Sequence, residues 1–153
     1  MAGGVATAGQ TAETIAFASA AEMREVLTRL LAEIDRDSDL GRRLRSAHLS
    51  YRYVFTDLGI TLSVASSDDD THNVRWSFSD APEWEPELTL EMSSEVANRY
   101  LQGCENLAIA MARGRIHCSC EARAALSLLP INTQLSACYR EVLERRYPHL
   151  LLS

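Results

Sequence analysis

Four short segments between residues 49 and 92 alternate apolar and polar side chains, and this alternation constrains the fold more than any other feature. Successive side chains of a strand point to opposite faces, so each segment predicts a strand with one apolar face. The apolar positions are Leu49, Tyr51, Tyr53 and Phe55, then Ile60, Leu62 and Val64, then Val74, Trp76 and Phe78, and finally Leu88, Leu90 and Met92. Asp57-Leu58-Gly59 predicts a hairpin between the first two strands. Four such strands in succession predict an antiparallel sheet with one wet face.

The N-terminal residues differ from the rest of the chain. Residues 1–18 are rich in Ala, Gly and Thr and have no sustained period, so a disordered N-terminal tail is predicted. A docking role for Ile15 to Phe17 is the alternative. Residues 19–153 are expected to form a single domain, because a chain of 153 residues is within the usual size of one domain.

Helical periodicity comes before the strands. Ser19 and Glu22 fit a capping box, and the apolar residues that follow are spaced for one face of a helix. This helix is expected to fade near Asp37, and a shorter one is expected from Ser38 through Arg45. Helices of this kind supply the apolar stripes that can cover the apolar face of the sheet.

Two short helices are expected after the strands, each ending at a glycine, the residue that most readily adopts the left-handed conformation. Ser93 or Ser94 caps the first helix, which ends at Gly103. The second helix begins with Cys104 and ends at Gly114.

The strand period returns at residues 115–120, which predict a fifth strand. A helical segment is expected at residues 121–129, and Asn132 can cap a final helix that ends before Pro148. The predicted order is helix, four strands, two helices, one strand and one or two helices. We therefore expect a two-layer α+β sandwich.

Charge and residue types exclude several classes of function. The chain has 21 acidic and 15 basic residues, and a net charge of −6 opposes binding to a phosphate backbone, so nucleic acid is not an expected partner. All basic residues are arginine, which excludes Schiff-base chemistry on a lysine of this chain. Neither a dinucleotide fingerprint nor a phosphate loop nor a nucleophile elbow occurs. We expect no cofactor and no enzymatic activity.

Two groups of metal-ligating residue types have simpler explanations. His117 to Cys120 contains zinc-ligand types, but strand geometry points His117 away from the two cysteines, which favours small core thiols. The acidic residues 68–70 with His72 lack the spacing of a calcium loop and favour a solvated loop. No apolar run is long enough for a membrane helix and no secretory pattern begins the sequence, so a cytoplasmic protein is expected.

Three stretches, at residues 87–95, 101–103 and 110–116, resemble motifs of the sterol carrier protein 2 (SCP2) family and fit a stand-alone bacterial member of it. Residues 87–95 look like the family's strand followed by a serine-capped helix, and Leu101-Gln102-Gly103 resembles its helix-ending glycine. Ala110-Met111-Ala112-Arg113-Gly114-Arg115-Ile116 is similar to its alanine-bearing helix and basic-Gly-basic-Ile turn. The resemblance covers roughly residues 47 to 130. The chain departs from the family at Ser119 and Cys120, where a glycine is usual and a bulkier residue could narrow the cavity.

The resemblance implies a five-stranded, mainly antiparallel sheet with helices packed on one face around a hydrophobic tunnel. It also implies lipid binding and lipid transport: non-catalytic binding and transfer of a fatty acid, an acyl-CoA, a sterol or an isoprenoid. The tunnel would be lined by side chains of the sheet, the central helices and the last helix: Leu90, Met92, Tyr100, Leu101, Leu107, Met111, Leu135, Tyr139 and Leu143.

Two other functions fit the same residues. The protein could be an accessory or tailoring protein of a biosynthetic pathway that holds a hydrophobic intermediate, which a tyrosine such as Tyr100 or Tyr139 projecting into the cavity would favour. It could also be an interaction module with a closed cavity that docks to a larger enzyme through its N-terminal tail. A homodimer is a further partner considered.

Overall fold

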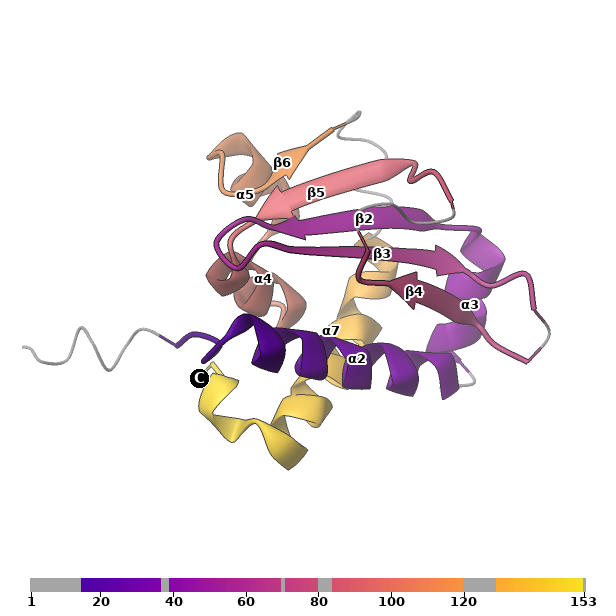
Figure 1. Ribbon diagram of the computed structural model, residues 1–153, viewed down its shortest axis with the longest axis horizontal. Helices are drawn as coiled ribbons and strands as arrows, with labels where there is room; N and C mark the ends of the chain where they lie inside the picture. Colours follow the sequence, from indigo (N-terminus) through magenta and orange to yellow (C-terminus); the bar gives the residue numbers. More distant parts are fainter. Residues whose placement is uncertain (1–14, 37–38, 70, 80–83, 120–128, 153) are drawn as a thin grey trace, which may run out of the picture.

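A five-stranded sheet in the order β4-β3-β2-β5-β6 forms the frame of the fold. The computed structural model describes residues 15–36, 39–69, 71–79, 84–119 and 129–152, with side chains of the last range described from residue 133 (Figure 1). The strands are β2 (Ser50–Phe55), β3 (Ile60–Ser66), β4 (Val74–Ser77), β5 (Leu88–Met92) and β6 (His117–Cys118).

The sheet is mixed, with β2 and β5 parallel at its centre. The pairs β2–β3, β3–β4 and β5–β6 are antiparallel, so the mainly antiparallel α+β fold predicted from the resemblance is confirmed. The simpler expectation, that four successive strands form an antiparallel sheet, is wrong for β5. After β4, at one edge of the sheet, the chain crosses to the other side of the β2–β3 hairpin. There β5 runs in the same direction as β4 and β2, so it pairs with β2 in parallel.

The predicted alternation decides which face of the sheet is covered. Tyr53 in β2 lies opposite Leu62 in β3 and Leu90 in β5, so apolar side chains share one face. One residue along β2, Arg52 lies opposite Ser63 and Thr89 on the other face. The register therefore keeps the apolar stripes of the strands together across the parallel pair as well as the hairpin.

Helices cover the apolar face. Figure 1 shows α2, α4 and α7 on one side of the sheet, with α3 at one end and α5 beside β6. Their bounds are α2 (Ala20–Arg36), α3 (Leu40–Ala47), α4 (Ser94–Leu101), α5 (Leu107–Ala112) and α7 (Leu129–Arg146), followed by a short 3-10 helix, Pro148–Leu150. The prediction of helices packed on one face of the sheet is confirmed.

Two predicted helix starts are capped as expected. The Ser19 hydroxyl accepts a hydrogen bond from the Glu22 N–H at 3.1 Å, and the Glu22 carboxylate accepts one from the Ala18 N–H at 2.8 Å. Ser93 is the cap of α4, because its hydroxyl accepts the Val96 N–H at 3.2 Å. These side chains satisfy N–H groups that the first turn of a helix leaves without a backbone partner.

Other element bounds differ from the prediction. The second central helix begins at Leu107 rather than Cys104, because Asn106 caps it by accepting the Ile109 N–H at 2.9 Å. The final helix begins at Leu129, so Asn132 lies within its first turns and is not its cap. Pro130 fits this start, since the first turn of a helix needs no proline N–H. The fifth strand is shorter than predicted. Of the helix predicted at residues 121–129, residues 121–128 lie outside the described residues and Leu129 begins α7.

The predicted tail meets the core at its last residues. Phe17 is buried, with 7% of its surface exposed, and Ile15 packs against the same core. The core therefore begins before Ser19, the boundary expected from the capping box. Residues 1–14 lie outside the described residues, and their disorder stays a prediction.

Candidate functional site

An apolar cavity of about 80 Å³ lies between the sheet and the helices. Its walls come mainly from α2 and from β2 and β3, and residues of β4, β5, α3, α4 and α7 contribute the remainder. The lining residues are Leu27, Leu30, Leu31, Ile34, Leu44, Leu49, Tyr51, Tyr53, Phe55, Leu62, Val64, Ala65, Ser66, Val74, Met92, Ala97, Tyr100, Leu101 and Leu135. Every one of them is uncharged, so the cavity suits an apolar ligand.

Four of the nine predicted tunnel residues line this cavity: Met92, Tyr100, Leu101 and Leu135. Leu90, Leu107, Tyr139 and Leu143 are instead fully enclosed by other core side chains, and Met111 packs against the core without lining the cavity. Ligand contact by any of the nine stays a prediction. The structure places the space nearer to β3 and α2 than the resemblance implied.

The wall formed by α2 and the β2–β3 hairpin was not among the predicted ligand-binding residues. Leu27, Leu30, Leu31 and Ile34 repeat at helical spacing, and Tyr51, Tyr53, Phe55 and Leu62 alternate along the hairpin, so both patterns were visible in the sequence. Each pattern identifies a buried face. Neither distinguishes a face that borders a cavity from one that borders closely packed side chains.

Ser66, the lining residue with an aliphatic hydroxyl, has a structural role. Its hydroxyl donates to the Leu44 carbonyl at 2.6 Å and accepts from the Leu49 N–H at 2.8 Å. These bonds tie the end of α3 to the start of the β2–β3 hairpin. The Ser66 hydroxyl is thereby held away from a role as a nucleophile.

A second set of hydrogen-bonded polar side chains, those of Asn98, Gln102 and Tyr139, lies in the interior beside α7. The Asn98 carbonyl oxygen accepts the Tyr139 hydroxyl at 2.7 Å, and the Asn98 amide donates to the Leu150 carbonyl at 3.0 Å. Gln102 donates to the same carbonyl at 2.9 Å and accepts the Leu152 N–H at 3.0 Å. These hydrogen bonds hold Leu150 and Leu152, near the C-terminus, against the end of α4.

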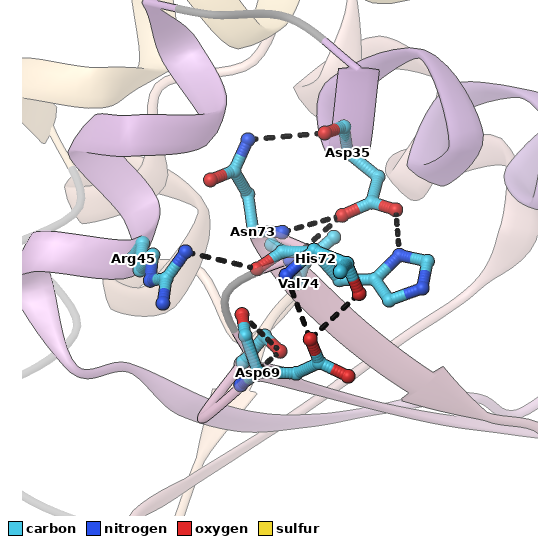
Figure 2. A network of polar contacts seen from close by, with 8 residues as sticks. Asp35, Arg45, Asp69, His72, Asn73 and Val74 are labelled. Carbon is cyan, nitrogen blue, oxygen red and sulfur yellow. Dashed lines mark hydrogen bonds and ion pairs between the residues drawn. The ribbon is translucent and has the colours of Figure 1, made fainter.

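Asp35, at the end of α2, organises a polar cluster next to the cavity (Figure 2). One carboxylate oxygen accepts the N–H groups of Asn73 at 2.6 Å and Val74 at 3.1 Å, and the other lies 2.6 Å from Nδ1 of His72. Arg45 donates to the His72 carbonyl at 3.4 Å. Ile34 and Val74 line the cavity, so this cluster joins two of its walls.

The cluster favours opposite charges on its two ionisable partners. Burial opposes the ionisation of Asp35, but hydrogen bonds from His72, Val74 and Asn73 outweigh it and lower the pKa of the carboxyl. The hydrogen bond to Asp35 and its negative charge raise the pKa of His72, against a smaller effect of desolvation. The pair therefore joins α2 to β4 most strongly when His72 is protonated.

Metal and membrane sites can be judged only on the described part of the chain. There, no group of three or more His, Cys, Asp or Glu side chains could hold a metal ion. His117 lies opposite Glu91 and Cys118 opposite Leu90, so the two side chains lie on different faces of the sheet, as expected. No helix in this part of the chain is long and apolar enough to cross a membrane.

No protein-family model and no curated protein matches the sequence. Solved structures do share its fold. The ubiquinone synthesis protein UbiJ-SCP2 aligns with 75% of this chain and 92% of its own length, at 13% identity and a TM-score of 0.56. A conserved hypothetical protein of Thermus thermophilus, suggested to be a sterol carrier protein, aligns over 84% and 91%, at 13% identity and a TM-score of 0.54.

The fold also occurs as part of a larger protein. The inverting sec-alkylsulfatase Pisa1 of Pseudomonas sp. matches 67% of this chain at 14% identity and a TM-score of 0.50, and the chain spans only 14% of that protein's length. At these identities the matches establish architecture. The chain therefore has the SCP2-like fold, that of the sterol carrier protein 2 family.

Proposed function

We propose that this protein binds a hydrophobic small molecule in the cavity between α2 and the sheet and carries it without changing it chemically. The observation that carries the proposal is a lining made entirely of uncharged side chains, most of them leucine, valine or aromatic residues. Fatty acids, acyl-CoA, sterols and isoprenoids are the ligand classes considered. The SCP2-like fold supports this choice, since solved structures with the fold include a sterol carrier protein.

The size of the cavity implies that it widens on binding. Sites for drug-sized ligands usually have volumes of about 300–1,000 Å³, whereas this cavity has about 80 Å³. Much of its wall is leucine on α2, and these side chains can change rotamer while the strands stay fixed by their hydrogen bonds. We propose that a ligand occupies the space by displacing side chains of α2.

The residue types of the lining support a carrier rather than an enzyme. Among the described residues the lining contains no acid, histidine or cysteine, and the Ser66 hydroxyl is already bonded on both sides. General acid–base and nucleophilic catalysis most often use these residue types within reach of the ligand. We also propose a cytoplasmic location, which the exposed free thiol of Cys104 supports.

A second candidate is an accessory protein that holds a biosynthetic intermediate. The specific observation in its favour is that Tyr100, one of the two tyrosines expected to favour this role, lines the cavity. UbiJ-SCP2, which has the same fold, is described as a ubiquinone synthesis protein. The two candidates share the binding site, and the identity of a co-purifying molecule would distinguish them.

A pair of matched variants tests the binding site. Val64→Phe places a larger side chain into the cavity wall, while Val54→Phe makes the same change on a neighbouring strand at a residue outside the lining. We expect Val64→Phe to weaken binding of an uncharged dye such as Nile red at least about tenfold, and Val54→Phe to preserve it. Mass spectrometry of organic extracts should find a hydrophobic molecule with the wild type and the control. Equal binding by both variants would refute this location of the site.

A further inference from the structure

We infer that the cavity recognises one uncharged, hydrogen-bond-accepting oxygen of its ligand through the hydroxyl of Tyr53. This inference rests on the proposed binding function and narrows it to a class of ligand. It combines the position of Tyr53, the state of its hydroxyl and the charge of its surroundings.

Tyr53 lies at the centre of the sheet, where few side chains can reach solvent. It is in the middle of β2, flanked by Leu62 and Leu90 on the neighbouring strands. Its ring is stacked on that of Phe55, with ring centres 6.2 Å apart and planes at 3°. The ring is therefore held by its neighbours and lines the cavity in a defined orientation.

The Tyr53 hydroxyl differs from the hydroxyls of Tyr139 and Tyr147. The Tyr139 hydroxyl donates to Asn98, and the Tyr147 hydroxyl accepts from Arg29 and donates to Glu25. Buried tyrosine hydroxyls usually have a partner of this kind. The contacts of the described residues give the Tyr53 hydroxyl none.

The unpaired hydroxyl is nevertheless open to space. Some polar side-chain atoms of the described residues have neither accessible surface nor a hydrogen-bond partner: Arg52 Nε, Ser63 Oγ, Trp84 Nε1 and Gln134 Oε1. The hydroxyl of Tyr53, a half-buried residue, is not one of them. The space that it reaches is the cavity, because Tyr53 is one of the lining residues.

The surroundings determine which partner this hydroxyl can take. Burial raises the pKa of Tyr53 well above its usual value, and the nearby Tyr100 and Tyr51 raise it further, so the hydroxyl keeps its proton and can donate it. A carboxylate or phosphate in the cavity would lose its hydration without gaining a cation from the described lining residues, because none of them carries a positive charge. The matching ligand is an alcohol, an ester or a ketone on an apolar body. A fatty acid would have to bind in its protonated form.

Dye displacement with ligands of matched size tests the inference. Decanol and decanone carry one oxygen, undecane has the same number of heavy atoms without it, and decanoate carries a charge. The preference for oxygen is measured as the ratio of the affinities for decanol or decanone to the affinity for undecane. Because the oxygen loses its hydration on burial, we expect this ratio to be about three- to tenfold higher in the wild type than in Tyr53→Phe, with undecane bound equally by both. Decanoate should bind most weakly at about pH 9, where it is ionised.

Tyr139→Phe is the control, because the hydroxyl that it removes is bonded to Asn98 and lies outside the cavity lining. It should keep the preference for oxygen. Tyr53→Phe should melt no lower than the wild type, since it removes a hydroxyl with no partner. An unchanged preference for oxygen in Tyr53→Phe would overturn the inference and leave apolar binding in place. Failure of every ligand to displace the dye would overturn the proposed function and this inference together.

Discussion

The covered side of the sheet has two halves that are packed in different ways. Between α2 and the β2–β3 hairpin, apolar side chains surround a cavity, and the Tyr53 hydroxyl has no hydrogen-bond partner among the described residues. Beside α7, Tyr139 and Leu143 are completely buried, and the Tyr139 hydroxyl is bonded to Asn98. The hydroxyls of these two core tyrosines therefore differ, because that of Tyr139 is hydrogen-bonded and that of Tyr53 borders the cavity. One half of the interior is thus closely packed, and the other half contains the space that we propose for the ligand.

The largest expected effect is a loss of stability that differs between two leucines, Leu143 and Leu62. Leu143→Ala removes a side chain from the closed half, where every methyl group has neighbours, and should lower the free energy of unfolding by about 4 kcal/mol. Leu62→Ala enlarges an existing cavity and should cost about 2 kcal/mol, because Leu62 has fewer contacts to lose. Urea denaturation would measure both. Equal losses would show that the two halves are packed alike.

The next effect concerns the polar bonds of the closed half. Asn98→Ala leaves the Tyr139 hydroxyl without its partner and the Leu150 carbonyl with only its bond from Gln102, and it should lower the free energy of unfolding by about 3 kcal/mol. Asn106→Ala, which removes the cap of α5, is the control and should cost about 1 kcal/mol. The same denaturation curves would decide. A loss for Asn98→Ala no greater than for the control would contradict the structural role of this cluster.

The smallest effect is a dependence on pH at the Asp35 cluster. Because the pKa of His72 is raised in the folded protein, its contribution is complete below the ordinary value of 6.5 and is lost as the pH rises through the raised pKa. The difference in melting temperature between wild type and His72→Asn should therefore shrink between about pH 6 and pH 8. The lowered pKa of Asp35 acts at the acid end, where its contribution is lost as the pH falls through the folded-state value.

His117→Asn, a change at an exposed histidine on the other face of β6, is the matched control for this experiment. Its melting temperature should follow the wild type across the same range. A difference between wild type and His72→Asn that grows with pH would have the wrong sign for a charge-assisted bond to Asp35. Such a result would show that the bond between His72 and Asp35 does not help to join α2 to β4.

Local features of the fold could be predicted because neighbouring residues determine them. The alternation around Tyr53 indicated the strands and their covered face, and the Ser19 and Ser93 hydroxyls marked helix starts through bonds to residues three positions away. Pairing between distant segments could not be predicted in this way. Tyr53 and Leu90 each belong to a stripe with an apolar period of two, and nothing local indicates that their strands lie side by side and parallel.

The site was predicted less fully than the fold, for a related physical reason. Leu62 and Leu143 are both leucines on a regular apolar stripe, and the sequence predicts burial for each. Whether a buried side chain borders space depends on how several elements fit together in three dimensions. The unpaired state of the Tyr53 hydroxyl also depends on what lies opposite it. The cavity and the state of the Tyr53 hydroxyl are therefore properties of the assembled core.

The parallel pairing of β2 with β5 has a consequence for the order of folding. The β2–β3 hairpin joins residues that are close in sequence, whereas β5 can pair with β2 only after β3, β4 and the chain beyond them have been made. Because closing a long loop is slow, we expect the hairpin to form first and the centre of the sheet to be completed late. During that interval one edge of β2 and the ring of Tyr53 would be open to water. Nascent chains would then be most prone to aggregate through this strand.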